Sequence, residues 1–177
     1  RKSKLLYPIF MEKKVKKKII IIGGGFGGCM AAKHLAKQDF EIILFDKRNH
    51  HVFQPLLYQV ATAMLSPAQI AYPIRSMFRK LNNVRVLIGN VNDVNVEKRY
   101  ITLKRSSQKF EYDYLIIAAG ARHSYFGKPE WEKLAWGLKT TKDALKIRER
   151  MLYSFEKAER TRYQSKRKKF STFVIIG

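Results

Sequence analysis

Residues 19–28 read Ile-Ile-Ile-Ile-Gly-Gly-Gly-Phe-Gly-Gly, an apolar run that ends in a glycine cluster of the GxGxxG type, Gly23 to Gly28. A helix pattern follows the cluster, and a second apolar run, Glu41 to Phe45, ends at Asp46. Strand, glycine turn, helix and strand within about 30 residues predict a β-α-β unit with parallel strands. The sequence therefore predicts an α/β, Rossmann-like domain. Four helix residues are expected to face the sheet: Met30, Ala31, Leu35 and Ala36.

The glycine cluster has the spacing that a diphosphate-binding turn requires. Gly23 permits a tight turn, Gly25 lets the backbone approach a pyrophosphate, and Gly28 lets helix and strand pack closely. A phosphate there meets unpaired amide N–H groups and the positive end of the helix dipole, so no lysine is required. Asp46 is placed to accept hydrogen bonds from an adenosine ribose, and its charge favours FAD or NAD over NADP. The motif does not choose between FAD and NAD.

The rest of the chain continues the α/β pattern. Residues 49–73, which contain three prolines, are expected to form loops and short helices. The further expected elements are a helix at 74–81, strands at 84–88 and 114–119, a small antiparallel β-meander within 91–112, a long helix from 141 to about 164, and a buried strand at 171–176.

The chain is strongly basic, with 36 Lys and Arg against 14 Asp and Glu and a formal net charge of +22. Much of this charge lies in residues 1–18 and in a late cluster of Arg160, Arg162, Lys166, Arg167, Lys168 and Lys169. Such runs are typical of solvated arms or faces, with an anionic partner as the alternative. The interleaved aromatic and basic residues of nucleic-acid-binding modules are missing, so no nucleic acid is expected.

Cys29 is the one cysteine of the sequence, which excludes a disulfide within the chain and a thiol redox pair. It is expected to pack between helix and sheet, and the composition fits a reducing, cytoplasmic compartment. No apolar stretch approaches the roughly 20 residues that span a bilayer. The histidines are interpreted as one exposed helix residue and three loop residues: His34, then His50, His51 and His123. Because none has a carboxylate or cysteine partner at ligand spacing, no metal site is predicted.

Several segments beyond the glycine cluster resemble one enzyme family. They read HHVFQPLLYQVAT at 50–62, LSP at 65–67, IAYPIR at 70–75, and YDYLIIAAG at 112–120. These segments look like type II NADH:quinone oxidoreductase, and the similarity runs from about Lys17 to Gly177. The resemblance implies a flavoprotein with two dinucleotide-binding domains, FAD in the first and NADH in the second. It also implies that electrons pass from NADH through the flavin to a membrane quinone.

The resemblance assigns cofactor contacts residue by residue and leaves the catalytic residues unassigned. Gln54 and Thr62 would lie towards the flavin ring with Phe53 nearby, and Gly120 would end a strand close to the cofactor. Ala119 departs from the family, in which a threonine is common at this place, so the hydrogen bond of that hydroxyl is in doubt. The FAD pyrophosphate would be lined by Gly23, Gly25, Phe26, Gly27 and Gly28, the ribose by Asp46, the adenosine by Lys47 and the adenine by the backbone near Val91.

The expected domain organisation is an N-terminal basic arm at 1–17, the first part of an FAD-binding domain at 18–128, and a helical connection at 129–170. Residues 171–177 are expected to be the first strand of a truncated NADH-binding, Rossmann-like domain. Met11 is interpreted as the natural start, with residues 1–10 upstream of it. When full length, the protein is expected on the cytoplasmic face of the inner membrane as a peripheral protein.

Two alternatives stay open beside the oxidoreductase. One is a non-catalytic, truncated nucleotide-binding module, and the other is a basic protein that binds anionic surfaces. NADH and quinone are the partners expected of the full-length protein, with an anionic membrane surface and a homodimer left open.

The resemblance places the NADH-binding turn and the later flavin and quinone contacts beyond residue 177. We therefore expect that the purified 177-residue chain, supplied with FAD and quinone, does not oxidise NADH. Absorbance at 340 nm is the measurement, and a steady loss of NADH would contradict this expectation.

Overall fold

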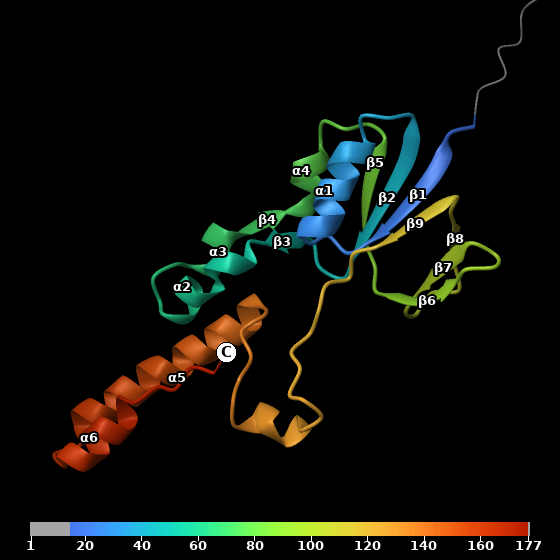
Figure 1. The fold of residues 1–177 in the computed structure, drawn as a ribbon. Helices are drawn as coiled ribbons and strands as arrows, with labels where there is room; N and C mark the ends of the chain where they lie inside the picture. The colour runs from blue at the N-terminus through green and yellow to red at the C-terminus, as the bar shows by residue number, and fades with distance from the viewer. Residues whose placement is uncertain (1–14, 177) are drawn as a thin grey trace, which may run out of the picture.

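The computed structural model describes residues 15–176 as a four-stranded parallel sheet with attached elements (Figure 1). The predicted arm, apart from residues 15–17, and the predicted start at Met11 lie outside the described residues, as does Gly177. The strands have the order β5-β2-β1-β9 and are all parallel, which confirms the predicted parallel sheet. Their bounds are β1 Lys17–Ile22, β2 Phe40–Asp46, β5 Val84–Ile88 and β9 Tyr114–Ile117.

The apolar run of β1 is buried because both faces of the sheet are covered. Ile19 and Ile21 pack on one side under α1 (Phe26–Leu35) and α4 (Ile74–Phe78), which lie side by side in front of the sheet in Figure 1. Ile20 points to the opposite face. Successive side chains of a strand alternate between faces, so a run of isoleucines serves a sheet with two cores.

The second face is covered by the predicted meander, which is confirmed as a three-stranded antiparallel sheet. Ile101 is fully buried in this core, and the Phe110 ring lies edge-on to the Phe45 ring at a centroid distance of 4.9 Å. The strands are β6 Val91–Asn95, β7 Tyr100–Leu103 and β8 Lys109–Glu111.

Between β2 and α4 the chain leaves the sheet in a two-stranded ribbon that carries three short helices, as Figure 1 shows. Val52, Val60 and Ile70 form a separate small core with Ala144 of the long helix α5, Thr141–Arg160. The elements are β3 His50–Val52, a 3-10 helix Gln54–Leu56, α2 Leu57–Ala61, α3 Pro67–Ile70 and β4 Ala71–Pro73.

The C-terminal part extends away from the sheet as a helical arm (Figure 1). After a 3-10 helix, Pro129–Lys133, a long helix α5 (Thr141–Arg160) begins at a capping box in which Thr140 and Asp143 bond to each other's backbone N–H. The predicted helix is confirmed, but it ends at Arg160 rather than near Gln164, where a new helix, α6 (Gln164–Phe170), begins.

The strand predicted at 171–176 is not formed. Among the described residues, this segment has no strand neighbour, and Val174, Ile175 and Ile176 are 81%, 95% and 81% exposed. The Phe173 ring instead packs beside Phe155 of α5 at a centroid distance of 5.6 Å. An apolar β-pattern forms a strand only where another strand lies beside it, and this segment lies along α5 instead (Figure 1).

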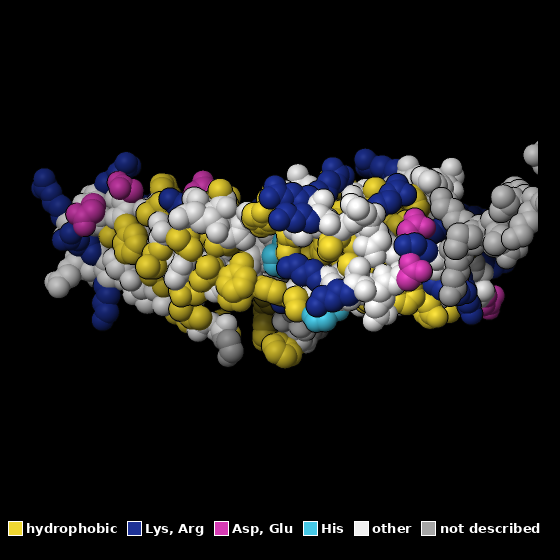
Figure 2. Space-filling view, turned by 90° about the horizontal axis from the view of Figure 1, so that it is seen from above, with side chains coloured by type: hydrophobic (Ala, Val, Ile, Leu, Met, Phe, Trp, Pro, Cys, Tyr) yellow, Lys and Arg dark blue, Asp and Glu magenta, His cyan; other side chains and the backbone are white. Residues whose placement is uncertain are grey.

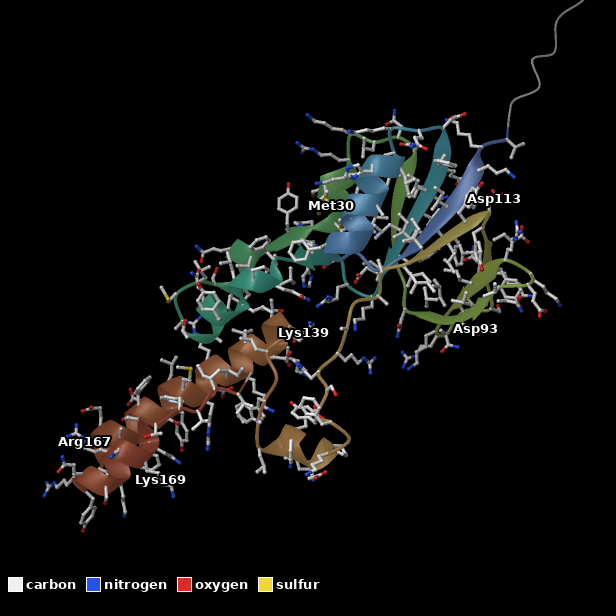
Figure 3. All side chains as sticks on the ribbon, viewed as in Figure 1. Met30, Asp93, Asp113, Lys139, Arg167 and Lys169 are labelled. Carbon is white, nitrogen blue, oxygen red and sulfur yellow. The ribbon has the colours of Figure 1, made fainter. Side chains whose placement is uncertain are left out.

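Two other predictions need correction. Met30 does not face the sheet but is 51% exposed (Figure 3), because the helix is rotated so that Cys29 and Ala32 are its buried residues. Strand β9 was expected to be buried, yet Tyr114 and Ile117 are 54% and 67% exposed. It is one of the two edge strands of this sheet and, within the part of the chain that the structure describes, pairs with β1 alone.

Basic side chains are scattered over the surface seen from above in Figure 2, where they clearly outnumber acidic ones. Hydrophobic side chains gather at the left of this view, over the helical arm, where Leu152, Tyr153 and Phe155 of α5 are about half exposed. Within residues 15–176, none of the helices combines the length and apolar character needed to cross a bilayer.

Asp113 joins β1 to the start of β9 (Figure 3). Its carboxylate accepts hydrogen bonds from the Lys18 backbone N–H at 2.7 Å and the Lys17 ammonium at 3.1 Å, and its own N–H donates to the Lys18 carbonyl. The Lys18 bond first and the Lys17 bond second lower the pKa of Asp113 below its ordinary value of 3.8.

A carboxylate with a lowered folded-state pKa stabilises the fold above its unfolded pKa, and this stabilisation is lost as the pH falls through the lowered value. Asp113→Asn should therefore reduce the urea midpoint at pH 7, and the difference from the parent should shrink below pH 3.8. Asp93→Asn, at an exposed position of β6, is the control for charge alone. A pH-independent difference at Asp113 would show that the carboxylate is not the stabilising group.

Candidate dinucleotide-binding site

The glycine turn lies at the carboxyl end of β1, between β2 and β9. Gly23 has a φ of +108°, its N–H donates to the Phe45 carbonyl at 2.7 Å, and a Cβ on it would overlap the Ala118 carbonyl oxygen. A Cβ on Gly28 would likewise overlap the Gly23 carbonyl oxygen. Both positions exclude any side chain, so α1 begins directly above the end of the strand.

Gly25 has the opposite surroundings. It is the residue that caps α1 at its N-terminus, its φ is −78°, and a Cβ on it would meet nothing within 4 Å. The first-turn amides of α1 lack acceptors inside the helix, and the helix dipole adds positive potential at the same place. The open space beside Gly25 therefore suits a diphosphate, which needs close backbone approach and N–H donors.

Asp46 ends β2 beside this turn. Its Oδ2 accepts a hydrogen bond from the Gly24 N–H at 2.6 Å, and its Oδ1 accepts one from the Arg48 N–H at 2.7 Å. The side chain is 11% exposed. Each carboxylate oxygen has two lone pairs, so the exposed part retains acceptor capacity for ribose hydroxyls. The structure thus gives Asp46 a second task, holding the turn, that the sequence did not predict.

Three other predicted residues lie at the same edge of the sheet. Lys47 follows Asp46 and is exposed. Val91 begins β6 just after β5, where the Gly89 N–H donates to the Asp46 carbonyl at 2.9 Å. Gly120 follows β9 with a φ of +76° and has open space around it.

The residues expected near the flavin, apart from Gly120, lie in two places. Phe53 lies edge-on to Phe26 at a centroid distance of 5.6 Å, which places the neighbouring Gln54, itself exposed, near the glycine turn. Thr62 lies farther along, at the C-terminal end of α2, and its hydroxyl donates to the Tyr58 carbonyl at 2.9 Å. No contact of Thr62 with the turn is seen in the described part of the chain.

Two residues next to the turn were missed by sequence reasoning. His51, expected in a loop, lies with His50 in β3, and its Nδ1 is 3.0 Å from the Gly24 carbonyl oxygen. The buried Nε of Arg48 has no hydrogen-bond partner and lies 4.0 Å from Asp46 Oδ1. An unpaired buried donor of this kind is uncommon in folded proteins. The HH dipeptide at 50–51, four residues after Asp46, was the available signal for His51.

Cys29 is 3% exposed, which confirms its packing position, and burial raises the pKa of its thiol above the ordinary value of 9.0. His123 does have a carboxylate neighbour, contrary to expectation, since its Nε2 lies 3.8 Å from Asp143 Oδ2. His123 and Asp143 lie far apart in the sequence, so no rule on the spacing of metal ligands could have predicted this contact. Over residues 15–176, no three His, Cys, Asp or Glu side chains gather as metal ligands would.

Comparison with known proteins agrees with this geometry. Residues 17–177 match the family described as pyridine nucleotide-disulphide oxidoreductase. The type II NADH:quinone oxidoreductases Ndh and NdhA of Mycobacterium tuberculosis are 44% and 46% identical over 162 residues, or 90% of this chain, and the chain covers 35% and 34% of them. The structure of NDH2 from Plasmodium falciparum in complex with NADH has a TM-score of 0.75 at 34% identity, over 88% of this chain and 32% of that one.

These matches confirm the resemblance to type II NADH:quinone oxidoreductase found in the sequence. The chain spans about a third of the length of the relatives it matches.

The two glycines at either end of α1's first turn give a matched pair of substitutions. Gly28→Ala should lower the free energy of unfolding by roughly 2–3 kcal/mol, because the methyl group meets backbone that cannot yield. Gly25→Ala should cost less than about 1 kcal/mol, since its methyl enters open space, yet it should abolish ADP binding. Urea unfolding and calorimetric titration are the measurements. Equal destabilisation by both substitutions would contradict the geometry.

Proposed function

Since the chain belongs to the pyridine nucleotide-disulphide oxidoreductase family, we propose that its glycine turn holds the ADP half of FAD, the cofactor of that family. The observation that carries the proposal is the open space beside Gly25 at the start of α1, with the Asp46 carboxylate bonded to the neighbouring Gly24 amide. Diphosphate and ribose would thus be recognised by backbone N–H groups and one carboxylate, without a basic side chain.

The proposed contacts are those expected from the sequence. The pyrophosphate is lined by Gly23, Gly25, Phe26, Gly27 and Gly28, the ribose by Asp46, the adenosine by Lys47 and the adenine by the backbone near Val91. Gln54 and Thr62 lie towards the flavin ring, and Gly120 ends a strand close to the cofactor.

This chain spans about a third of the length of its relatives, and for a whole protein of their length the proposed activity is that of NADH:quinone oxidoreductase. The bound flavin supplies the chemistry by which two electrons pass from NADH to a quinone. The support is the level of identity, 44% to Ndh of M. tuberculosis over 90% of this chain. This chain would bind and orient the cofactor's nucleotide end.

The domain organisation also remains a proposal: a basic arm at 1–17, the first part of an FAD-binding domain at 18–128 and a helical connection at 129–170. Residues 171–177 would lead into an NADH-binding domain. Attachment to the cytoplasmic face of the inner membrane is proposed as well, supported by the quinone in the relatives' names and by the cationic charge of the chain. The homodimer stays an open prediction.

Competition between nucleotide ligands tests the cofactor assignment directly. FAD and ADP should bind with a shared site, whereas FMN, which lacks the AMP part of FAD and keeps only one of its two phosphates, should not displace ADP. Adenosine 2′,5′-bisphosphate should compete at least about tenfold more weakly than AMP, because the two ligands differ only in the 2′-phosphate, which Asp46 repels. Flavin fluorescence and competition titrations measure this. Displacement by FMN as strong as by FAD would overturn the proposal.

A further inference from the structure

The backbone of Gly24 is held by side chains at its N–H and at its C=O. Its N–H donates to Asp46 Oδ2 at 2.6 Å, and its carbonyl oxygen lies 3.0 Å from His51 Nδ1 and 3.3 Å from Cys29 Sγ. A carbonyl oxygen accepts only, so His51 Nδ1 must carry the proton and donate. Three elements, the end of β2, the start of β3 and α1, thus converge on one glycine.

The direction of the Gly24 carbonyl also fixes the next amide. A trans peptide is planar, and its C=O and the following N–H point to opposite sides. With the Gly24 oxygen turned towards His51 and Cys29, the Gly25 N–H points away from them. Gly25 borders the open space, and its N–H has no acceptor among the described residues, so this donor is available to a diphosphate placed there.

Without such a hold, the peptide that joins Gly24 to Gly25 would be free to rotate. Gly24 and Gly25 are consecutive glycines, and glycine has the widest range of accessible backbone conformations. Ordering that peptide only when the ligand binds would cost conformational entropy. A hold that is already present in the free protein removes this cost. The Phe26 ring, 4.9 Å from the imidazole in an edge-on contact, keeps His51 in place.

We propose that His51 is a positioning residue for the dinucleotide: through the Gly24 carbonyl, with Cys29 as a weaker second donor, it presets the Gly25 amide for the FAD diphosphate. This inference rests on the proposed FAD site. His51 itself contacts the turn and not the phosphate.

Three variants of the full 177-residue chain separate the donor from the ring. His51→Leu removes both and should weaken FAD binding about three- to tenfold, the effect of one lost hydrogen bond. His51→Asn lacks the ring but places an N–H near the position of Nδ1, and it should restore affinity to within about twofold. His50→Leu is the control, because the imidazole of His50 is bonded to Asn49 Oδ1. Urea midpoints of all three should stay close to that of the parent.

A second measurement needs no FAD. The ¹⁵N order parameter of the Gly25 amide in the free protein should fall in His51→Leu and stay at the parent value in His51→Asn and His50→Leu. Unchanged Gly25 order in His51→Leu, or equal FAD affinity of parent and His51→Leu, would overturn the positioning role alone. Absence of FAD binding by the parent would overturn the proposed function, while the order parameter would still decide whether the hold exists.

Discussion

The close approach of α1 to the end of β1 is the constraint that organises this molecule. Gly28 lies against the Gly23 carbonyl, and Gly23 lies against the Ala118 carbonyl, so helix, first strand and edge strand meet without intervening side chains. Packing this tight brings the N-terminal amides of α1 to the carboxyl edge of the parallel sheet. Ligands of open α/β sheets bind at that edge. The binding surface is thus a direct result of how the strand and helix are joined.

The remaining elements act on that junction from two sides. The sheet is buried between α1 and α4 on one face and the meander on the other, which makes the strand ends rigid. The ribbon after β2 brings His51 and Phe53 back to the turn, where they contact Gly24 and Phe26. The many lysines and arginines contribute little to this site, because backbone amides and the helix dipole attract the phosphate. Their charge acts over the surface as a whole.

Much of the sheet could be predicted because its signals are local. The glycine spacing with the flanking apolar runs gave the β-α-β unit, and the polar and apolar alternation at 91–112 gave the meander. The rotation of α1 could not be read from apolar residues alone, since Gly28 sets which side faces the strand and leaves Met30 in solvent. Residues 171–176 carry a strand pattern, but strand pairing depends on a neighbour that a local pattern does not supply.

The positions of Gly25 and Asp46 beside the ends of β1 and β2 followed from the motif, because its spacing is local. The hold on Gly24 depends on the ribbon folding back across 27 residues from His51, which no spacing rule describes. A ¹H–¹⁵N spectrum of the labelled chain titrated with ADP tests the central claim most directly. The account predicts the largest shift changes at the amides of Gly24 to Gly28 and smaller ones at 46–48. Changes centred on the helical arm, with the glycine turn unaffected at saturating ADP, would contradict it.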